Sequence, residues 1–334
     1  MGSMAETVGV LLLTYGSPAT LADVPQYLAN VRGGRPMPEE ELHELEAEFT
    51  RRYDLIGGSP LIARTREQTD ALGAELARQF PDGPTFRTGI GMRFSEPSIT
   101  TAVAEMARAG VERIIGIIMS PQYSPLIMGG YHRAVDAAVA TLGEGAPTVT
   151  VAGPWHDEPL FQEALAQRVR EGLDRFPPEI RGRVPVLFSA HSMPRRVTDQ
   201  EPEYIEQLQE TARGIAGRVG LPESRWMFCY QSAGHEPGEW LRPDFKDIMP
   251  DLAKEGHHEV LMSPVQFLAD HLEILYDIDH GAREEAEREG ISFARIESLN
   301  TSPLFIRALA AIVTKERGSG RMERQPTAAN AAGD

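Results

Sequence analysis

The sequence predicts an α/β protein made of two similar domains, each with a four-stranded parallel sheet flanked by helices. Three observations predict this class. Short runs of β-branched and apolar residues alternate with longer amphipathic patterns along the whole chain. The length of 334 residues is too great for one typical hydrophobic core. The strand-like runs also divide into two sets of four, with the break near Trp155.

In the first set, each apolar run is followed by a helical pattern. The predicted strands are 8–14, 85–91, 113–120 and 148–152, and the predicted helices are 21–31, 39–51, 60–79, 98–108 and 130–142. The second set has predicted strands at 184–190, 225–231, 259–265 and 292–297, with helices at 202–219 and 244–255. Helices 158–176 and 302–315 follow the fourth strand of each set. This regular alternation is typical of βαβ units, which have parallel strands.

We therefore expect an N-terminal domain at 5–155 and a C-terminal domain at 156–317. Small and polar residues dominate 318–334, which we expect to be a disordered tail. The first four residues, MGSM, resemble an expression-tag remnant. The longest apolar runs, 8–13 and 114–119, are much shorter than a membrane span, so no integral membrane association is expected.

Charge and cysteine content exclude several classes of function. The net charge of -16 argues against nucleic acid and anionic membrane surfaces as partners. The single cysteine, Cys229, excludes a disulfide framework and a cysteine-ligated iron–sulfur cluster, and it fits a reducing cytoplasm. Only Gly16 follows the first strand where a dinucleotide fold has three glycines, and no phosphate-binding P-loop sequence is present.

Candidate ligand contacts follow several predicted strands, where open α/β sheets bind their ligands. Tyr15 follows the first strand and Tyr131 the third, and either could face a ligand or belong to ordinary packing and turns. His191 ends the fifth strand, in FSAHSMP, where a structural and a functional histidine are both reasonable. Arginines also gather around Gly57-Gly58-Ser59-Pro60, and they suit carboxylate recognition or a solvated helix surface.

An acidic helical pattern follows the seventh strand after Pro264. Asp270, Glu273, Asp277 and His280 are spaced by three, four and three residues, which predicts one polar face of an α-helix. Leucines and isoleucine supply a complementary apolar stripe, at positions 268, 272, 275 and 278. The polar face could bind a cation, accept protons or be an ordinary solvated surface.

Three segments in this order resemble the ferrochelatase family. They are FSAHSMP around His191, YQSAGHEPGEWLRPD from Tyr230, and PVQFLADHLEILYDID, which ends at Asp279. The resemblance extends over about 8–315. It implies two chelatase-like, Rossmann-like domains with a porphyrin between them, and it implies that His191 and Glu273 face each other across the porphyrin.

The resemblance implies insertion of Fe²⁺ into a free-base porphyrin. His191 and Glu273 are the implied catalytic residues, one accepting pyrrole protons and the other accepting protons or handling the metal, with the division of roles open. Asp277, one helical turn beyond Glu273, would lie where hydrated iron arrives. His191, Glu273 and Asp277 are therefore the predicted metal contacts. His271 is expected on another side of the helix from Glu273, as a structural residue.

The N-terminal half resembles one subgroup, the coproporphyrin III ferrochelatases of Gram-positive bacteria. That group carries a tyrosine at the position of Tyr15, where protoporphyrin-specific enzymes tend to have an aliphatic residue. Arg32, Arg52, Ser59 and Tyr131 fall on positions that resemble its propionate and pocket contacts. Coproporphyrin has four propionates and protoporphyrin two, which would explain local arginines in an acidic protein.

Two glycines depart from that subgroup. Gly33 stands where a second arginine is frequent, and Gly281 replaces an acid that completes an outer metal site in some members. A different set of propionate contacts is therefore expected, and an outer metal site is in doubt.

The expected function is haem biosynthesis by a cytoplasmic ferrochelatase that converts coproporphyrin III to coproheme. The alternatives are a protoporphyrin IX ferrochelatase, a chelatase of the cobalt, nickel or sirohaem pathways, and a porphyrin or haem carrier without activity. No tightly bound cofactor and no iron–sulfur cluster are expected, and Fe²⁺ is a substrate. We expect a monomer, with porphyrin and Fe²⁺ as partners, and the resemblance allows a transient contact with a coproheme decarboxylase.

Overall fold

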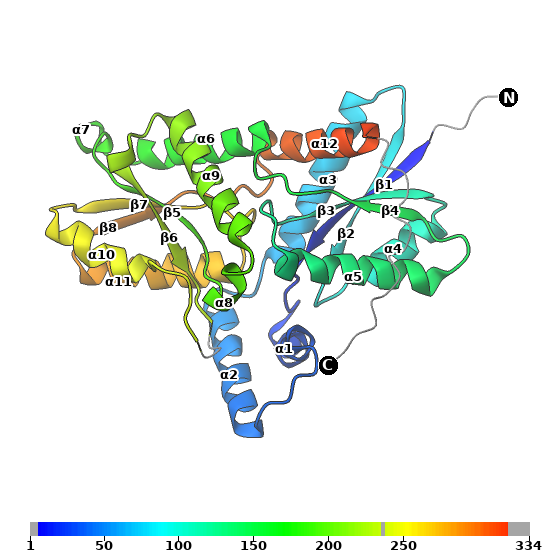
Figure 1. Ribbon diagram of the computed structural model, residues 1–334, viewed down its shortest axis with the longest axis horizontal. Coiled ribbons are helices and arrows are strands. Elements are labelled where there is room, and N and C mark those ends of the chain that lie inside the picture. Colours follow the sequence, from blue (N-terminus) through cyan, green and yellow to red (C-terminus); the bar gives the residue numbers. More distant parts are fainter. Residues whose placement is uncertain (1–5, 235–237, 320–334) are drawn as a thin grey trace.

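Two parallel four-stranded sheets with the same strand order form the framework of the protein (Figure 1). The computed structural model describes residues 6–234 and 238–319, except for the side chain of Val197. Residues 1–5, which include the predicted expression-tag remnant, and all of the predicted tail beyond Ser319 lie outside the described residues. The first sheet has the order β2-β1-β3-β4 and the second the order β6-β5-β7-β8. The predicted fold class is therefore confirmed.

The strands keep the predicted order along the chain, with small shifts at their ends. They are β1 (Thr7–Thr14), β2 (Thr85–Met92), β3 (Arg113–Ile118), β4 (Thr148–Val151), β5 (Val186–His191), β6 (Trp226–Gln231), β7 (Glu259–Pro264) and β8 (Ser292–Arg295). All six strand pairings are parallel.

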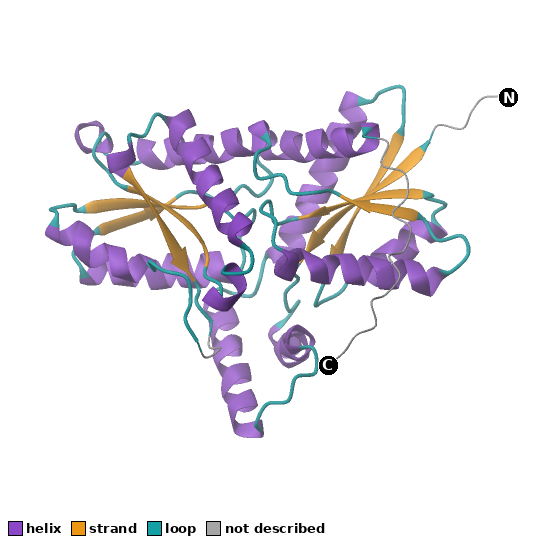
Figure 2. Cartoon of the chain, viewed as in Figure 1, coloured by secondary structure: helices purple, strands orange, loops and turns teal. Residues whose placement is uncertain are grey.

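Helices connect the strands and lie on both sides of each sheet (Figure 2). In the first half they are η1 (Leu21–Asp23), α1 (Val24–Arg32), α2 (Glu39–Leu55), α3 (Leu61–Gln79), α4 (Ile99–Arg108) and α5 (Pro125–Leu142). In the second half they are α6 (Pro159–Asp174), α7 (Pro178–Arg181), α8 (Arg195–Thr198), α9 (Pro202–Val219), η2 (Glu223–Arg225), α10 (Phe245–Lys254), the π-helix η3 (Glu273–Ala282), α11 (Arg283–Arg288) and α12 (Pro303–Gly318).

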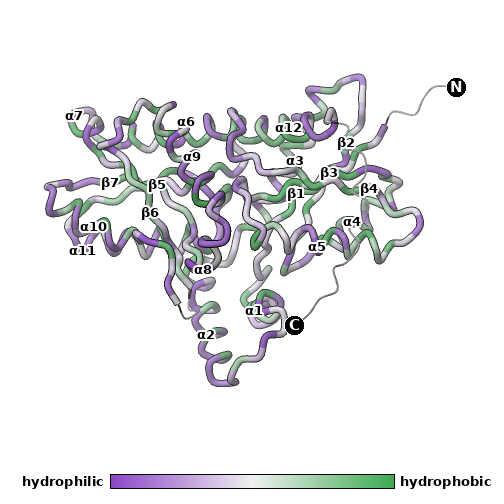
Figure 3. The backbone as a smooth tube through the Cα atoms, in the orientation of Figure 1, coloured by the Kyte–Doolittle hydropathy of each residue, from purple (hydrophilic) through white to green (hydrophobic). Residues whose placement is uncertain are grey.

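Strand β1 shows why the strands are continuous apolar runs. Val10 and Leu12 belong to the core on one face of the sheet, whereas Leu11 and Leu13 belong to the core on the other. Side chains alternate between the faces of a strand, and helices cover both faces of a parallel sheet. Both sets of side chains are therefore buried, which Figure 3 shows as apolar colouring along the central strands.

The two halves share one hydrophobic core at their junction. Helix α12 packs against both α3 and α6, so the last helix contacts each half (Figure 1). Trp155 lies where the sequence predicts the domain boundary, and its ring packs edge-on to Phe161 and near Phe305, at centroid distances of 5.0 and 6.4 Å. Its indole N–H donates to the carbonyl of Ile118 at 3.1 Å. These aromatic contacts fix α6 and α12 to the end of the first sheet.

Among the residues that the structure describes, no helix is long and apolar enough to cross a bilayer.

Shortening Phe305 to alanine tests the shared core. Phe305 is fully buried, so Phe305→Ala should lower the free energy of unfolding by about 3–5 kcal/mol, through lost apolar burial and the cavity left behind. Urea denaturation followed by tryptophan fluorescence measures the change. Arg307→Ala, an exposed position on the same helix, is the control and should change stability by less than about 0.5 kcal/mol. Equal effects of the two substitutions would contradict a core shared through α12.

Candidate active site

The predicted ligand contacts lie beside the point in each sheet where the strand order reverses. This point is between β1 and β3 in the first sheet and between β5 and β7 in the second. Tyr15 follows β1, and Tyr131 lies in α5, after β3. His191 is the last residue of β5, and Glu273 begins η3, after β7. Open parallel sheets bind ligands at the carboxyl ends of such strands, so the topology itself brings these positions to the binding edges.

His191 is held at the end of β5 by contacts on both its backbone and its ring. Its backbone N–H donates to the side-chain oxygen of Gln266 at 3.1 Å, and the Gln266 amide donates to the Tyr204 hydroxyl at 2.6 Å. Nδ1 of the ring lies 2.5 Å from the carbonyl oxygen of Ser192. A carbonyl oxygen only accepts hydrogen bonds, so Nδ1 carries the proton. In the neutral imidazole, Nε2 then has the free lone pair.

The helix after β7 differs from the predicted α-helix. From Glu273 to Ala282 it is a π-helix, with i→i+5 hydrogen bonds, and Asp270 precedes it. The predicted polar face is therefore wrong at its start, because the Asp270 carboxylate turns to Ser298 and Asn300. The predicted apolar stripe is largely correct, but Leu275 is only half-buried.

His271 pairs with Glu273, contrary to the expectation that it lies on another side of the helix. Its Nε2 is 3.1 Å from Oε2 of Glu273. The expectation failed because His271 precedes the helix, so helical spacing does not apply to it. Its Nδ1 donates to the carbonyl of Ala269 at 2.8 Å. The ring and the carboxylate therefore contact each other directly, and the bond to Ala269 fixes the orientation of the ring.

Asp277 lies near both candidate catalytic residues. Burial raises the pKa of its carboxyl group, and the negative charge of Glu273 raises it further. A hydrogen bond from the Ser232 hydroxyl and the positive charges of Arg52 and His191 oppose this rise. Ser232 has a φ of 59°, an uncommon backbone conformation for serine, directly after β6. The backbone at this strand end therefore aims the hydroxyl at Asp277.

Tyr15 approaches this group from the N-terminal half. Its ring packs edge-on against Phe94, with 4.6 Å between centroids, and 43% of the residue is exposed. Burial of the phenol raises its pKa, as does the charge of Glu273, whereas Arg93 and Arg35 lower it. The charge of Glu273, in the C-terminal half, therefore acts on a phenol of the N-terminal half.

Two further tyrosines of the N-terminal half are affected by the charge of Glu273. Burial raises the pKa of Tyr27 and of Tyr53, and the charge of Glu273 adds to both shifts. Tyr27 and Tyr53 belong to a small hydrophobic cluster that also contains Leu272. Leu272 thereby fixes the start of η3 against α1 and α2.

The four other predicted porphyrin contacts, besides Tyr15, have different surroundings. Arg32 is partly exposed and donates to the carbonyl of Arg35, and Ser59 accepts a long hydrogen bond of 3.4 Å from the Leu61 N–H. Arg52 forms an ion pair with Glu48 at 2.8 Å.

Tyr131 is 4% exposed, so nearly all of its surface is already covered by protein. The guanidinium of Arg93 lies over its ring, 5.6 Å from the centroid.

Sequence reasoning missed Arg93, which connects several of these residues. Its guanidinium also lies over the Phe94 ring at 4.5 Å. A side chain at Gly130 would meet that guanidinium at 2.1 Å, so the glycine leaves room for Arg93 in its present position. Its position in the sequence could have identified it, because Arg93 directly follows the second strand, at the edge of the sheet where ligands bind.

Within residues 6–234 and 238–319, no group of three or more histidine, cysteine, aspartate and glutamate side chains is close enough to form a metal site. The set of His191, Glu273 and Asp277 remains a prediction.

The chain is similar to curated ferrochelatases over most of its length. It is 39% identical to the ferrochelatase of Herpetosiphon aurantiacus over 312 residues, which cover 93% of this chain and 99% of the relative. It is 40% identical to the ferrochelatase of Deinococcus radiodurans, covering 93% of this chain and 96% of the relative. The coproporphyrin III ferrochelatase of Geobacillus kaustophilus is 37% identical, with the same two coverages.

Among solved structures, SirB from Bacillus subtilis with Fe³⁺ is similar in fold. The TM-score is 0.56 at 12% identity, over 94% of this chain and 96% of that one. The family profile described as Ferrochelatase matches residues 7–317. The chain therefore belongs to the ferrochelatase family, which makes it a metal-chelating lyase.

Proposed function

We propose that this ferrochelatase inserts Fe²⁺ into coproporphyrin III, bound between the two halves, to form coproheme. The observation that carries the proposal is the meeting of groups from both halves. His191, Glu273 and Asp277 belong to the second half, and Leu272, the neighbour of Glu273, packs against Tyr27 and Tyr53 of the first half. This contact supports a site at the junction of the two halves, where a ring held between them would meet the proton acceptors.

Insertion releases two pyrrole protons as the metal enters, so the site needs two acceptors. We assign Nε2 of His191 as one, because Nδ1 is committed to the Ser192 carbonyl. Glu273 is the other, and its contact with His271 orients the carboxylate. Bending the ring to expose its lone pairs costs on the order of 1–5 kcal/mol, which binding of the remote propionates can offset.

Two features support coproporphyrin III as the porphyrin. Tyr15 stands where the resembling subgroup has tyrosine, and arginines 32, 35, 51 and 52 lie on or just after α1 and α2. A guanidinium binds a carboxylate through paired hydrogen bonds, so this group suits a substrate with four propionates. The relatives include both ferrochelatases named without a substrate and coproporphyrin III ferrochelatases.

The proposal includes no resident cofactor. Cys229, the single cysteine, is fully buried in β6, and burial raises the pKa of its thiol, which disfavours the thiolate that a cluster would need. Fe²⁺ is a substrate that reaches the ring past Asp277. We further propose that the protein acts as a monomer in the cytoplasm and transfers its product during a transient contact with a decarboxylase.

Removing His191 should abolish metal insertion. Under anaerobic conditions, wild type should metallate coproporphyrin III with a higher kcat/KM than protoporphyrin IX, measured by absorbance. His191→Ala should lower kcat by at least about 100-fold, because general-base catalysis is lost. His258→Ala, at an exposed histidine, is the control and should have wild-type activity.

The same assay decides between the alternatives. Binding of porphyrin without metallation would indicate a carrier, and preference for protoporphyrin IX would contradict the role given to Tyr15.

Glu48 offers a test of the predicted propionate contact. Hydrogen bonds from Arg51 and Arg52 lower the pKa of Glu48 to about 2, so it stays ionised at working pH and competes with a propionate for Arg52. Glu48→Gln should therefore lower the KM for coproporphyrin III about two- to fivefold, the value of an exposed ion pair. Arg52→Ala should raise it. Steady-state kinetics from pH 6 to 8 should show no pH dependence of the Glu48 effect, since its carboxylate is ionised throughout.

The matched control is Glu75→Gln on α3. The Glu75 pKa is also lowered to about 2, by a hydrogen bond from Arg78, but no predicted porphyrin contact is involved. Its substitution should leave KM unchanged, and a KM change equal to that of Glu48→Gln would refute the competition.

A further inference from the structure

The π-helix η3 needs support from outside the helix. It extends for ten residues, whereas most π segments are single turns within α-helices. Both Glu273 and Asp277 lie in it, so its winding decides where their carboxylates point. A return to α-helical hydrogen bonding would rotate the two carboxylates relative to His191. The question is therefore which contacts maintain this winding.

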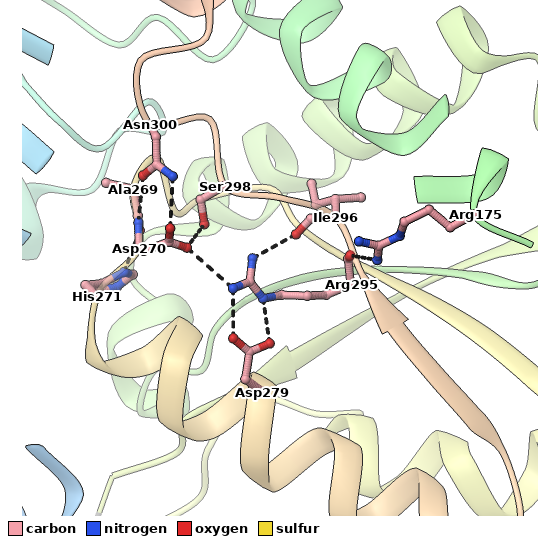
Figure 4. A network of polar contacts seen from close by, with 9 residues as sticks. All are labelled: Arg175, Ala269, Asp270, His271, Asp279, Arg295, Ile296, Ser298 and Asn300. Atoms are coloured by element: carbon pink, nitrogen blue, oxygen red, sulfur yellow. Dashed lines mark hydrogen bonds and ion pairs between the residues drawn. The ribbon is translucent and has the colours of Figure 1, made fainter. Parts of the chain in front are cut away.

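Arg295, the last residue of β8, contacts both a residue that precedes η3 and a residue inside η3 (Figure 4). Its Nε and Nη2 donate to the two carboxylate oxygens of Asp279, at 2.7 and 2.8 Å. Nη2 also lies 3.5 Å from Oδ1 of Asp270, which precedes the helix. The remaining amino group, Nη1, donates to the Ile296 carbonyl at 2.9 Å. One guanidinium thus bridges two carboxylates that are nine positions apart in the sequence.

The Asp270 end of this bridge is fixed by other groups. Its carboxylate accepts hydrogen bonds from Ser298 at 2.7 Å and from Asn300 at 2.9 Å, and its backbone N–H donates to Asn300 at 3.1 Å. Gln68 of α3, in the N-terminal half, donates to the backbone oxygens of Asn300 and Leu268 at 3.0 and 3.2 Å. The entrance of η3 is therefore tied to both halves of the protein.

The Asp279 end depends on Arg295 more strongly. The pair borders an open surface pocket of about 360 Å³ between η3, α11 and β8, whose lining includes Arg175, Arg283 and Phe293. Apolar packing is incomplete beside such a pocket, so the paired hydrogen bonds carry much of the contact. The Arg295 side chain is only 15% exposed, and its loss would leave two partly buried carboxylates without their counter-charge.

We propose that Arg295 is a positioning residue for metal insertion: by bridging Asp270 and Asp279 it keeps η3 in its π-helical winding and so directs Glu273 and Asp277 toward His191. A merely structural role would be to stabilise β8, the edge strand of the second sheet. The two roles differ in their consequences, because loss of a β8 contact would lower stability without changing the turnover of the folded enzyme. This inference rests on the proposed function, since it assigns Arg295 a role in that reaction.

The first test measures hydrogen exchange of the full chain by mass spectrometry, which requires no activity. Arg295→Met should speed amide exchange in peptides from residues 270–282 by about tenfold or more, through easier local opening. Asp279→Asn, a milder change, should act in the same direction. The control is Arg168→Met on α6, because Arg168 is 18% exposed and has an ion pair of 2.7 Å with Glu171. The control should leave exchange of these peptides unchanged.

The second test measures kcat and KM for coproporphyrin III and Fe²⁺ in the same variants. Arg295→Met should lower kcat about 10- to 100-fold, as loss of a supporting partner does at metal-handling sites, and should change the porphyrin KM less than about twofold. Asp279→Asn should lower kcat less, and Arg168→Met not at all. The proposal would be overturned if both Arg295→Met and Asp279→Asn kept wild-type hydrogen exchange and wild-type kcat. It would also be overturned if these variants had a lowered melting temperature but an unchanged kcat.

An inactive wild-type protein would refute the proposed function and, with it, the positioning role of Arg295 in that reaction. Hydrogen exchange would still decide whether Arg295 maintains η3. Active wild type with unaffected Arg295→Met would refute the positioning role alone.

Discussion

The negative charge of Glu273 acts on groups from both halves of the molecule. Burial raises the pKa of Tyr15, Tyr27 and Tyr53 in the N-terminal half and that of Asp277 in the same helix, and the charge of Glu273 adds to each rise. Water screens such interactions strongly, so they are felt only where protein replaces much of the solvent. This one carboxylate therefore acts on groups of both halves.

Several independent contacts fix that position. Leu272 packs into the cluster formed by α1 and α2, His271 contacts the carboxylate, and Arg295 joins the helix to the edge of the second sheet. The Glu273 side chain is 35% exposed, so its charge is partly withdrawn from water and is stabilised by a paired group. The same contacts that satisfy Glu273 also orient it, so stability and placement have a common cause here.

The fold was largely predictable from local patterns. Eight strands were located within a few residues because parallel strands buried on both faces are continuous apolar runs, as in β1. Their order within each sheet was not predictable, because it depends on pairing between distant segments. The repeat is therefore visible in the strand orders β2-β1-β3-β4 and β6-β5-β7-β8 and not as a clear repeat in the sequence.

The sequence by itself determined the family and the positions of His191 and Glu273, because their motifs follow recognisable strands and strand ends are where α/β sheets bind ligands. Only the tertiary structure decided that η3 is a π-helix, that His271 faces Glu273 and that Asp270 turns away to Ser298 and Asn300. The physical reason is the range of the interactions. Apolar spacing indicates which face of a helix is buried, but η3 also contacts Arg295, α1 and α2, which lie outside the helix, and spacing within the helix does not report those contacts.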